Sequence, residues 1–176
     1  MRSFGRLHVF ALCCVLPWLA APVHAQGQAP AYPNRPAKLI VAFTSGLVDT
    51  FARTVAQHLT DSLGQPFVVE NRPGASQAIG AEAAAKSAPD GYTLFMGTQS
   101  GLVLNTIARK SVPYDPVRDF APISLLFTTP LYLFVTPTVQ ANSVQQLIAL
   151  AKSRPGKLNF GSIGRGSSQH LAAEMF

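Results

Sequence analysis

The sequence predicts an α/β fold built around a mostly parallel sheet. Short apolar runs alternate with stretches of helical periodicity, and each apolar run leads into a turn rich in glycine or small polar residues. A strand that lies parallel to the one before it needs a crossover connection, which a helix supplies, so the alternation indicates helices over both faces of the sheet. In such sheets ligands bind at the carboxyl ends of the strands, where these turns lie.

The first unit of the alternation starts with residues 38–43 (KLIVAF), which have the pattern of a buried strand. After the turn 44–46, apolar residues recur at helical spacing from Val48 to Leu63, and Gly64 stands where the helix should end. Residues 26–36, rich in proline, glutamine and alanine, are expected to form an extended lead-in to this unit.

Two further units follow. Residues 67–69 (FVV) predict a second strand, and an alanine-rich stretch predicts a helix over 77–86. A Pro-Asp-Gly turn then precedes a third predicted strand, 92–96 (YTLFM), which ends in the small polar loop 97–100.

The chain changes character after residue 112. Residues 114–122 are rich in turn formers and link to the apolar runs 123–127 and 131–135, and this change predicts that the chain crosses into a second lobe. Ser143 followed by Gln146 resembles a capping box, so a helix is expected to run from there to the Pro155-Gly156 pair.

Residues 157–171 (KLNFGSIGRGSSQHL) predict a short strand, a glycine-rich turn and the start of a helix. The glycines allow a tight turn with exposed amides, and Ser167 or Ser168 can cap the helix. Unpaired N–H groups at a helix start attract anions, so a carboxylate or phosphate is the expected guest. The sequence ends at Phe176 inside this helix, so we expect the chain to be part of a larger parent.

Residues 1–25 have the pattern of a secretory signal peptide with cleavage after Ala25. Arg2 and Arg6 precede an apolar run that is too short for a membrane span, and small residues occupy the positions read by a signal peptidase. Both cysteines, Cys13 and Cys14, lie in this leader, so the mature chain should contain neither disulfides nor thiolate metal ligands. We therefore expect a soluble exported protein without membrane insertion after cleavage.

The basic residues are scattered along the chain rather than gathered into a stripe. The formal net charge is +6, which falls to +4 without the leader. This modest excess, without interleaved aromatics, argues against a nucleic-acid partner and suits anionic small-molecule ligands better.

Several separate blocks resemble the periplasmic solute-binding receptors of tripartite tricarboxylate transporters, the Bug family. The blocks are 32–36 (YPNRP), 69–75 (VENRPGA), 88–94 (APDGYTL), 113–116 (PYDP) with 119–122 (DFAP), and 155–160 (PGKLNF) running into the glycine-serine turn. The resemblance implies a type II periplasmic binding protein-like fold, in which two α/β lobes close on a ligand. Residues 37–112 would form part of the first lobe and 113–176 part of the second, within which the chain would be truncated.

The resemblance also implies a function. Such a receptor captures a small carboxylate or related metabolite for a membrane permease, without a cofactor, a metal or catalysis. A ligand-loaded receptor for a periplasmic sensor domain is an alternative. An exported α/β hydrolase is less favoured, because no Gly-x-Ser-x-Gly motif occurs and residues 97–101 (GTQSG) place the serine one position late.

The residues expected to bind the ligand lie on loops of both lobes. In the family a glycine run precedes an aspartate in the first loop, whereas this chain has Leu47 and Val48 there and a loop one residue shorter. The candidates are Ser45, Gly46 and Asp49 in the first loop, Thr98, Gln99 and Ser100 in the second, and Gly164, Arg165, Gly166, Ser167 and Ser168 in the third.

Two of these candidates have alternative roles. Asp49 either contacts ligand or stabilises the start of the first helix through its dipole. Arg165 either pairs with a ligand carboxylate or faces solvent. His170 is expected to be a partly buried packing residue, and no metal-binding spacing surrounds it.

Overall fold

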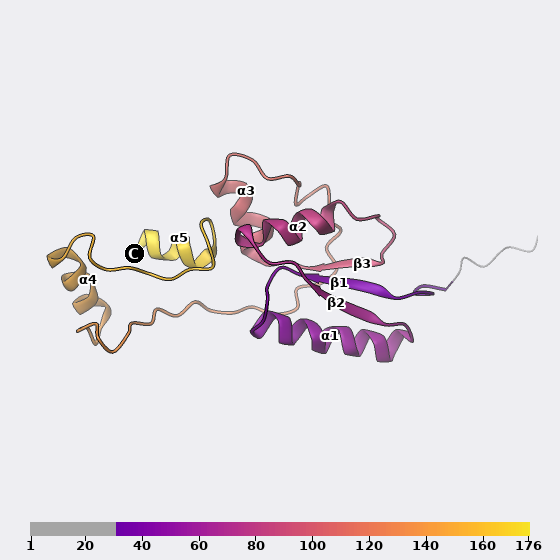
Figure 1. The fold of residues 1–176 in the computed structure, drawn as a ribbon, viewed down its shortest axis with the longest axis horizontal. Helices are drawn as coiled ribbons and strands as arrows, with labels where there is room; N and C mark the ends of the chain where they lie inside the picture. The colour runs from indigo at the N-terminus through magenta and orange to yellow at the C-terminus, as the bar shows by residue number, and fades with distance from the viewer. Residues whose placement is uncertain (1–30) are drawn as a thin grey trace, which may run out of the picture. The chain divides into compact units, whose positions relative to one another are not determined.

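A computed structural model describes residues 31–176, so the predicted signal peptide and the first part of the lead-in lie outside the described residues. Within this range three parallel strands form one sheet, in the order β2-β1-β3 (Figure 1). They are β1 (Ala37–Val41), β2 (Phe67–Asn71) and β3 (Thr93–Met96). The parallel sheet predicted from the alternation is therefore confirmed.

Helices cover both faces of the sheet. Helix α1 (Leu47–Leu63) packs its buried Ala52 and Ala56 against Leu39 and Val41 of β1, with Phe67 and Met96 completing the core. Helix α2 (Ala78–Ala85) lies on the opposite face, where Ala78 and Ala81 join Tyr114 in a second buried cluster (Figure 1). This is the double coverage that parallel strands require.

Helix α1 ends where the sequence predicted. Gly64 adopts the left-handed conformation with φ of 72°, and its N–H donates to the Thr60 carbonyl. A side chain at this φ would be strained, so glycine is the residue that terminates the helix best.

The connection after β3 is more helical than the sequence indicated. The predicted loop runs directly into a π-helical turn, η2 (Ser100–Leu104), and then into α3 (Asn105–Ala108). Before α2, the 3-10 turn η1 (Ala75–Gln77) occupies the end of the turn that precedes the predicted alanine-rich helix.

Helix α4 (Val144–Ser153) begins with the predicted capping box. Ser143 Oγ accepts from the Gln146 amide at 3.2 Å, and Gln146 Oε1 accepts from the Asn142 amide at 2.7 Å. Helix α5 (Ser168–Met175) is capped by Ser167, whose hydroxyl accepts from the His170 amide at 3.2 Å.

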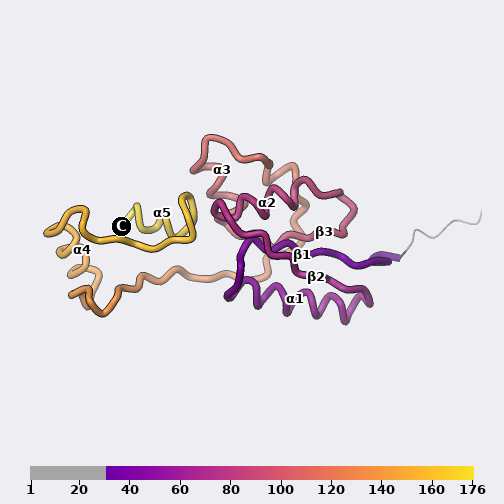
Figure 2. The backbone as a smooth tube through the Cα atoms, viewed as in Figure 1, coloured from indigo at the N-terminus to yellow at the C-terminus, as the bar shows by residue number. Residues whose placement is uncertain are grey.

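The predicted short strand at 157–160 is wrong for this structure, in which these residues are assigned no strand, and the apolar runs 123–127 and 131–135 also form none. Figure 2 traces part of the stretch between α3 and α4 as extended backbone. Many of its apolar side chains are exposed, including Ile123 at 82% and Phe134 at 84%. A strand needs a hydrogen-bonded neighbour, and no described segment pairs with this stretch.

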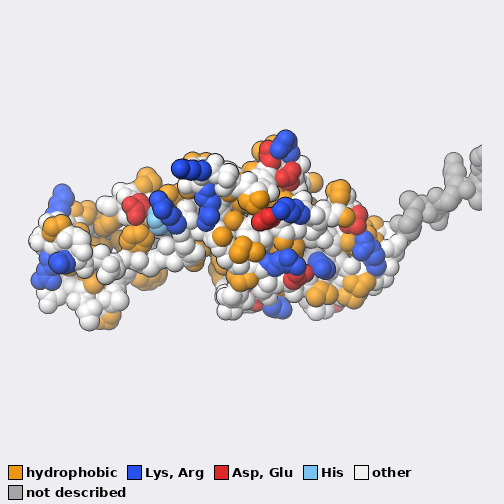
Figure 3. All heavy atoms as spheres, turned by 45° about the horizontal axis from the view of Figure 1, so that its top comes forward, with side chains coloured by type: hydrophobic (Ala, Val, Ile, Leu, Met, Phe, Trp, Pro, Cys, Tyr) orange, Lys and Arg blue, Asp and Glu red, His pale blue; other side chains and the backbone are white. Residues whose placement is uncertain are grey.

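The division into lobes at residues 112 and 113 stays a prediction. In the described part of the chain, no helix is long and apolar enough to cross a membrane. Figure 3 shows Lys and Arg side chains spread over the face in view and interspersed with Asp and Glu, as the scattered sequence positions suggested.

Candidate functional site

The carboxyl ends of the strands meet at one edge of the sheet. Val41, the last residue of β1, is in register with Asn71 of β2 and with Met96 of β3. The loops that follow these residues therefore start side by side, and two of the three predicted ligand loops are among them.

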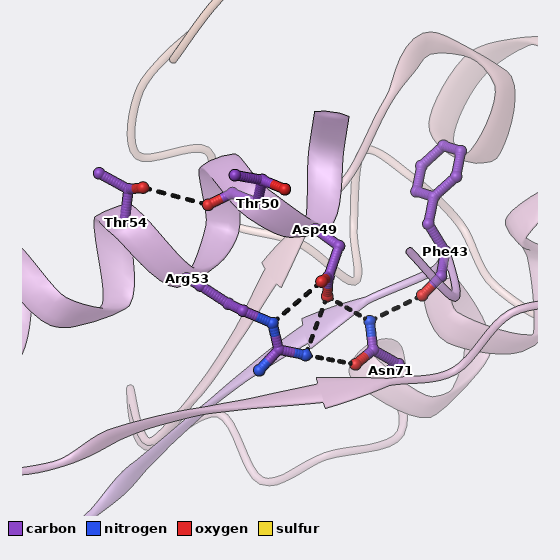
Figure 4. Close-up of polar contacts among 6 residues, drawn as sticks. All are labelled: Phe43, Asp49, Thr50, Arg53, Thr54 and Asn71. Carbon is purple, nitrogen blue, oxygen red and sulfur yellow. Dashed lines mark hydrogen bonds and ion pairs between the residues drawn. The ribbon is translucent and has the colours of Figure 1, made fainter. Parts of the chain in front are cut away.

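In the first predicted loop, Asp49 belongs to a polar network rather than facing open solvent. Asp49 is 8% exposed, and its carboxylate accepts from Arg53 Nε at 2.9 Å and Nη2 at 3.1 Å. Asn71 Nδ2 donates to Asp49 Oδ1 at 2.6 Å and to the Phe43 carbonyl at 2.7 Å (Figure 4). Asn71 Oδ1 also accepts from Arg53 Nη2 at 3.0 Å.

This network fixes the ionisation of its members. The hydrogen bonds from Arg53 and then Asn71 hold the pKa of Asp49 below its ordinary value. The same bond to Asp49 raises the pKa of Arg53. Since both carboxylate oxygens are engaged and the negative charge sits in the first turn of α1, the geometry matches the helix-stabilising role weighed for Asp49.

The other two predicted residues of this loop are exposed. Ser45 and Gly46 precede α1, and no side chain caps that helix start. Gly46 has φ of 115°, and open space surrounds the position that a Cβ would occupy. The first amides of α1 lack intrahelical acceptors by helix geometry, so they can donate hydrogen bonds to an anionic guest.

Between β2 and α2, three consecutive residues other than glycine have positive φ: Ala75 at 48°, Ser76 at 52° and Gln77 at 77°. Such conformations cost about 1–3 kcal/mol each and persist only where surrounding contacts hold them. Asn105 Nδ2 donates to the Ser76 carbonyl at 2.8 Å, and Arg109 Nη2 donates to the Ala75 carbonyl at 3.0 Å. Sequence analysis did not identify this segment.

The second predicted loop contacts this strained segment. Thr98 Oγ1 donates to Gln77 Oε1 at 2.6 Å, and Gln77 is only 2% exposed. Ser100 is buried at the start of η2, whereas Gln99 is exposed. Two of the three predicted residues therefore have polar partners, while the Gln99 side chain has none among residues 31–176.

The third predicted loop docks on the second. Ser100 Oγ lies 3.1 Å from Ser168 Oγ and accepts from the Ser168 amide at 3.1 Å. Ser76 Oγ donates to the Arg165 carbonyl at 2.8 Å. The structure thus brings residues 98–100 and 164–168 together, although Ser100 and Ser168 are 68 positions apart in the sequence.

Glycine is required at two positions of this docked turn. Gly164 has φ of 128°, and a Cβ there would meet Ser76 Oγ at 2.7 Å. Gly166 has φ of 84°, and a Cβ there would come within 3.3 Å of Ala108. Both glycines therefore allow close approach of the turn to η1 and α3 as well as the unusual backbone.

Several amides of the turn are already paired by the protein. The Gly164 amide donates to Ser162 Oγ, and the Ser167 amide donates to the Gly164 carbonyl. For the amides of Arg165 and Gly166, residues 31–176 supply no acceptor, and the exposed Arg165 guanidinium has no carboxylate partner within that range. Some of the bare amides predicted from the glycines are thus occupied by the protein itself, while those of Arg165 and Gly166 keep no acceptor in the described range.

His170 packs at the far side of this turn, with its ring centroid 6.0 Å from that of Phe160. Its Nε2 lies 3.8 Å from Glu174 Oε1, and its buried Nδ1 has no partner in the described part of the chain. Among residues 31–176 no group of three or more His, Cys, Asp or Glu side chains is arranged to hold a metal ion.

Residues 51–176 match the model of a protein family described as TctC, tripartite tricarboxylate transporter family receptor. Protein BugT of Bordetella pertussis is 41% identical over 178 aligned positions, which cover 100% of this chain and 53% of BugT. The chain spans about half the length of the curated relatives it matches.

Solved structures show the same similarity. A structure described as R. palustris Rpa4515 with adipate is 39% identical, has a TM-score of 0.77, and matches 82% of this chain and 48% of its own. A structure described as MatC (Rpa3494) from Rhodopseudomonas palustris with bound malate is 34% identical, has a TM-score of 0.51, and matches 54% of this chain and 33% of its own.

Proposed function

Because the chain belongs to the tripartite tricarboxylate transporter receptor family, we propose that it is a periplasmic solute-binding protein that captures a small dicarboxylate for a membrane permease. The family is one of receptors rather than enzymes, and we extend that non-catalytic role to this chain. Export through a signal peptide cleaved after Ala25 is part of the same proposal.

The observation that carries the proposal is the joining of loops 98–100 and 164–168 at the carboxyl edge of the sheet. Ser100 and Ser168 hold the two loops together, and the third loop carries the unpaired amides of Arg165 and Gly166 as well as the exposed Arg165 side chain. An anionic oxygen placed there would receive N–H donors and a nearby positive charge, the combination that favours a carboxylate.

The ligand class is narrowed by the similar proteins. The two solved structures are described with adipate and with malate, which are both dicarboxylates. The uncapped start of α1, after Ser45 and Gly46, lies at the same sheet edge and suits the second carboxylate. We therefore assign Ser45, Gly46, Thr98 and Ser100 to the ligand site. Gln99 and the turn residues Gly164, Arg165, Gly166, Ser167 and Ser168 complete it, with Asp49 stabilising the first loop.

Thermal unfolding of the purified chain with added adipate, malate or uncharged adipamide tests the proposal. A ligand that binds only the folded state stabilises it by about 2.7 kcal/mol at a concentration of one hundred times Kd. We expect a dicarboxylate to raise the unfolding temperature and adipamide to leave it unchanged. Equal responses to all three compounds, or no response to either dicarboxylate at millimolar concentration, would refute the proposal.

Arg165→Gln provides the matched variant. Its side chain is exposed, so the substitution should leave stability unchanged while weakening dicarboxylate binding about tenfold through loss of the charge. Delivery to a periplasmic sensor domain would use the same ligand site, and that role stays a prediction.

A further inference from the structure

Gln77 is a buried side chain whose polar atoms are only partly paired. It is 2% exposed at the end of the strained segment 75–77, and its Oε1 accepts from Thr98 Oγ1 at 2.6 Å. Its Nε2 is buried, and residues 31–176 provide no acceptor for it. A Cβ added to Gly101 would lie 3.1 Å from Gln77 Oε1 and 3.2 Å from Gln77 Cβ, so the side chain is packed in place.

The orientation of the Gln77 amide decides whether the Thr98 hydroxyl donates its hydrogen to Gln77 or keeps it for another acceptor. The oxygen and nitrogen of a glutamine amide have nearly the same shape, so the same heavy-atom positions fit the reversed amide. With Oε1 facing Thr98, the threonine hydroxyl must donate its hydrogen to Gln77. With Nε2 facing Thr98, Gln77 donates, and the hydroxyl hydrogen is free for another acceptor.

The reversed amide fits the buried surroundings better. The first orientation buries two unpaired N–H groups, whereas the reversed one buries one unpaired N–H and one carbonyl oxygen. Buried oxygens without a partner are tolerated better than buried N–H groups. Thr98 is only partly buried, so its freed hydrogen can reach a guest at the sheet edge.

We propose that Gln77 is a positioning residue whose amide donates to Thr98 Oγ1 and thereby directs the Thr98 hydroxyl hydrogen to a ligand carboxylate. This inference rests on the proposed function, since it requires a carboxylate beside Thr98. This role makes Gln77 a determinant of specificity. A Thr98 hydroxyl that must donate to the ligand favours a carboxylate, whose oxygens only accept hydrogen bonds, over a carboxamide, which also presents N–H groups. The strained backbone at 75–77 is what carries the Gln77 side chain to Thr98.

A double-mutant cycle with Gln77→Met and Thr98→Val tests this role. Methionine has nearly the length of glutamine without its amide N–H groups and carbonyl oxygen, and valine has the shape of threonine without the hydroxyl. Affinities of adipate and of its monoamide would be measured by calorimetry for the wild-type chain, both single variants and the double variant. Circular dichroism and thermal unfolding would check that each variant is folded.

We expect Thr98→Val to weaken adipate binding about ten- to a hundredfold and Gln77→Met to weaken it about three- to tenfold. Gln77→Met should also lower the preference for adipate over the monoamide, because the released hydroxyl can then accept from the amide. In the Thr98→Val background, Gln77→Met should change neither the affinity nor the preference.

Gln77→Met could instead weaken the binding of adipate and of its monoamide by the same factor, and do so in the Thr98→Val background as well. That result would show that Gln77 only supports the loop, and it would overturn the inference. Absence of wild-type binding to either ligand would overturn the proposed function and this inference with it. If Gln77→Met does not fold, the side-chain amide resonance of Gln77 in the ¹⁵N-labelled wild-type chain decides. It should shift on addition of adipate and stay unshifted in Thr98→Val, and a shift of equal size in both would contradict the inference.

Discussion

Replacing Asn71 by alanine should destabilise the first βα unit by more than the loss of one exposed hydrogen bond would. Asn71 is the last residue of β2, and its amide donates to Asp49 and to the Phe43 carbonyl while accepting from Arg53. The substitution removes all three bonds together. It also leaves the Phe43 carbonyl and one carboxylate oxygen of Asp49 without this partner.

The magnitude follows from the types of bond lost. A bond to a charged group contributes about 1.5–3 kcal/mol and a neutral one about 0.5–1.5 kcal/mol, with lower values where water has access. Since Arg53 still pairs with Asp49 in the variant, the contributions do not add fully, and we expect a loss of about 2–3 kcal/mol. For a domain of this size that corresponds to a fall in Tm of about 5–10 °C.

Urea unfolding followed by circular dichroism at neutral pH measures the loss. Gln57→Ala is the matched control, because Gln57 also offers a side-chain amide, donating one exposed bond to Asp61 at 2.8 Å. That variant should lose about 0.5 kcal/mol or less. If Asn71→Ala were destabilised no more than Gln57→Ala, the network in Figure 4 would not be what stabilises the first loop.

Further predictions concern pH, packing and loop docking. The pKa of Asp49 is lowered mainly by Arg53, that of Glu70 by Arg72, and that of Asp115 by the backbone amides of Val117 and Arg118. A carboxyl group whose pKa is lower in the folded state than in the unfolded state, where it is about 4, stabilises the fold at pH values above that unfolded-state pKa. This stabilisation is lost as the pH falls through the folded-state pKa. The free energy of unfolding should therefore decrease between pH 5 and 3. Urea titrations across that range should show a smaller decrease for Asp49→Asn, and an unchanged decrease would contradict the assignment. Gly80→Ala should lower the free energy of unfolding by about 1–3 kcal/mol, because the new Cβ would meet Ala42 Cβ at 2.8 Å and the Arg72 carbonyl at 3.0 Å. The control Gly161→Ala places its Cβ in open space and should be nearly neutral. Equal unfolding midpoints for the two variants would refute this prediction. Ser100→Ala should lower the free energy of unfolding by about 1–2 kcal/mol. Because the substitution removes the hydroxyl that accepts from the Ser168 amide, hydrogen exchange at that amide should become faster. An unchanged exchange rate would exclude this docking contact.

Local signals in the sequence predicted several helix ends well. Gly64 ends α1, Ser143 and Gln146 form the capping box of α4, and one of the two candidate serines caps α5. Each of these depends on residues within four positions of one another, so the pattern contains the whole interaction. The strand predicted at 157–160 failed for the opposite reason, since a strand depends on a neighbour that its own residues do not specify.

The candidate site was predicted as loops but not as an assembly. The glycines of the third loop pointed to bare amides, yet Ser100 and Ser162 already occupy some of them. The positive φ values at Ala75, Ser76 and Gln77 had no signal in the residue types, because alanine, serine and glutamine rarely adopt that conformation. A buried asparagine, Asn105, holds the segment from about thirty residues away, and such a contact cannot be read from local pattern.

The contacts that hold these loops have a consequence for binding. Asp49 and Asn71 fix the first loop, Asn105 and Arg109 hold the segment 75–77, and Ser100 holds the third loop, all without a ligand. A site whose loops are already ordered loses little conformational entropy when the ligand binds, so more of the interaction energy appears as affinity. Substitutions in these supporting residues should therefore weaken binding even where they touch no ligand, and they should do so in proportion to the loop order they remove.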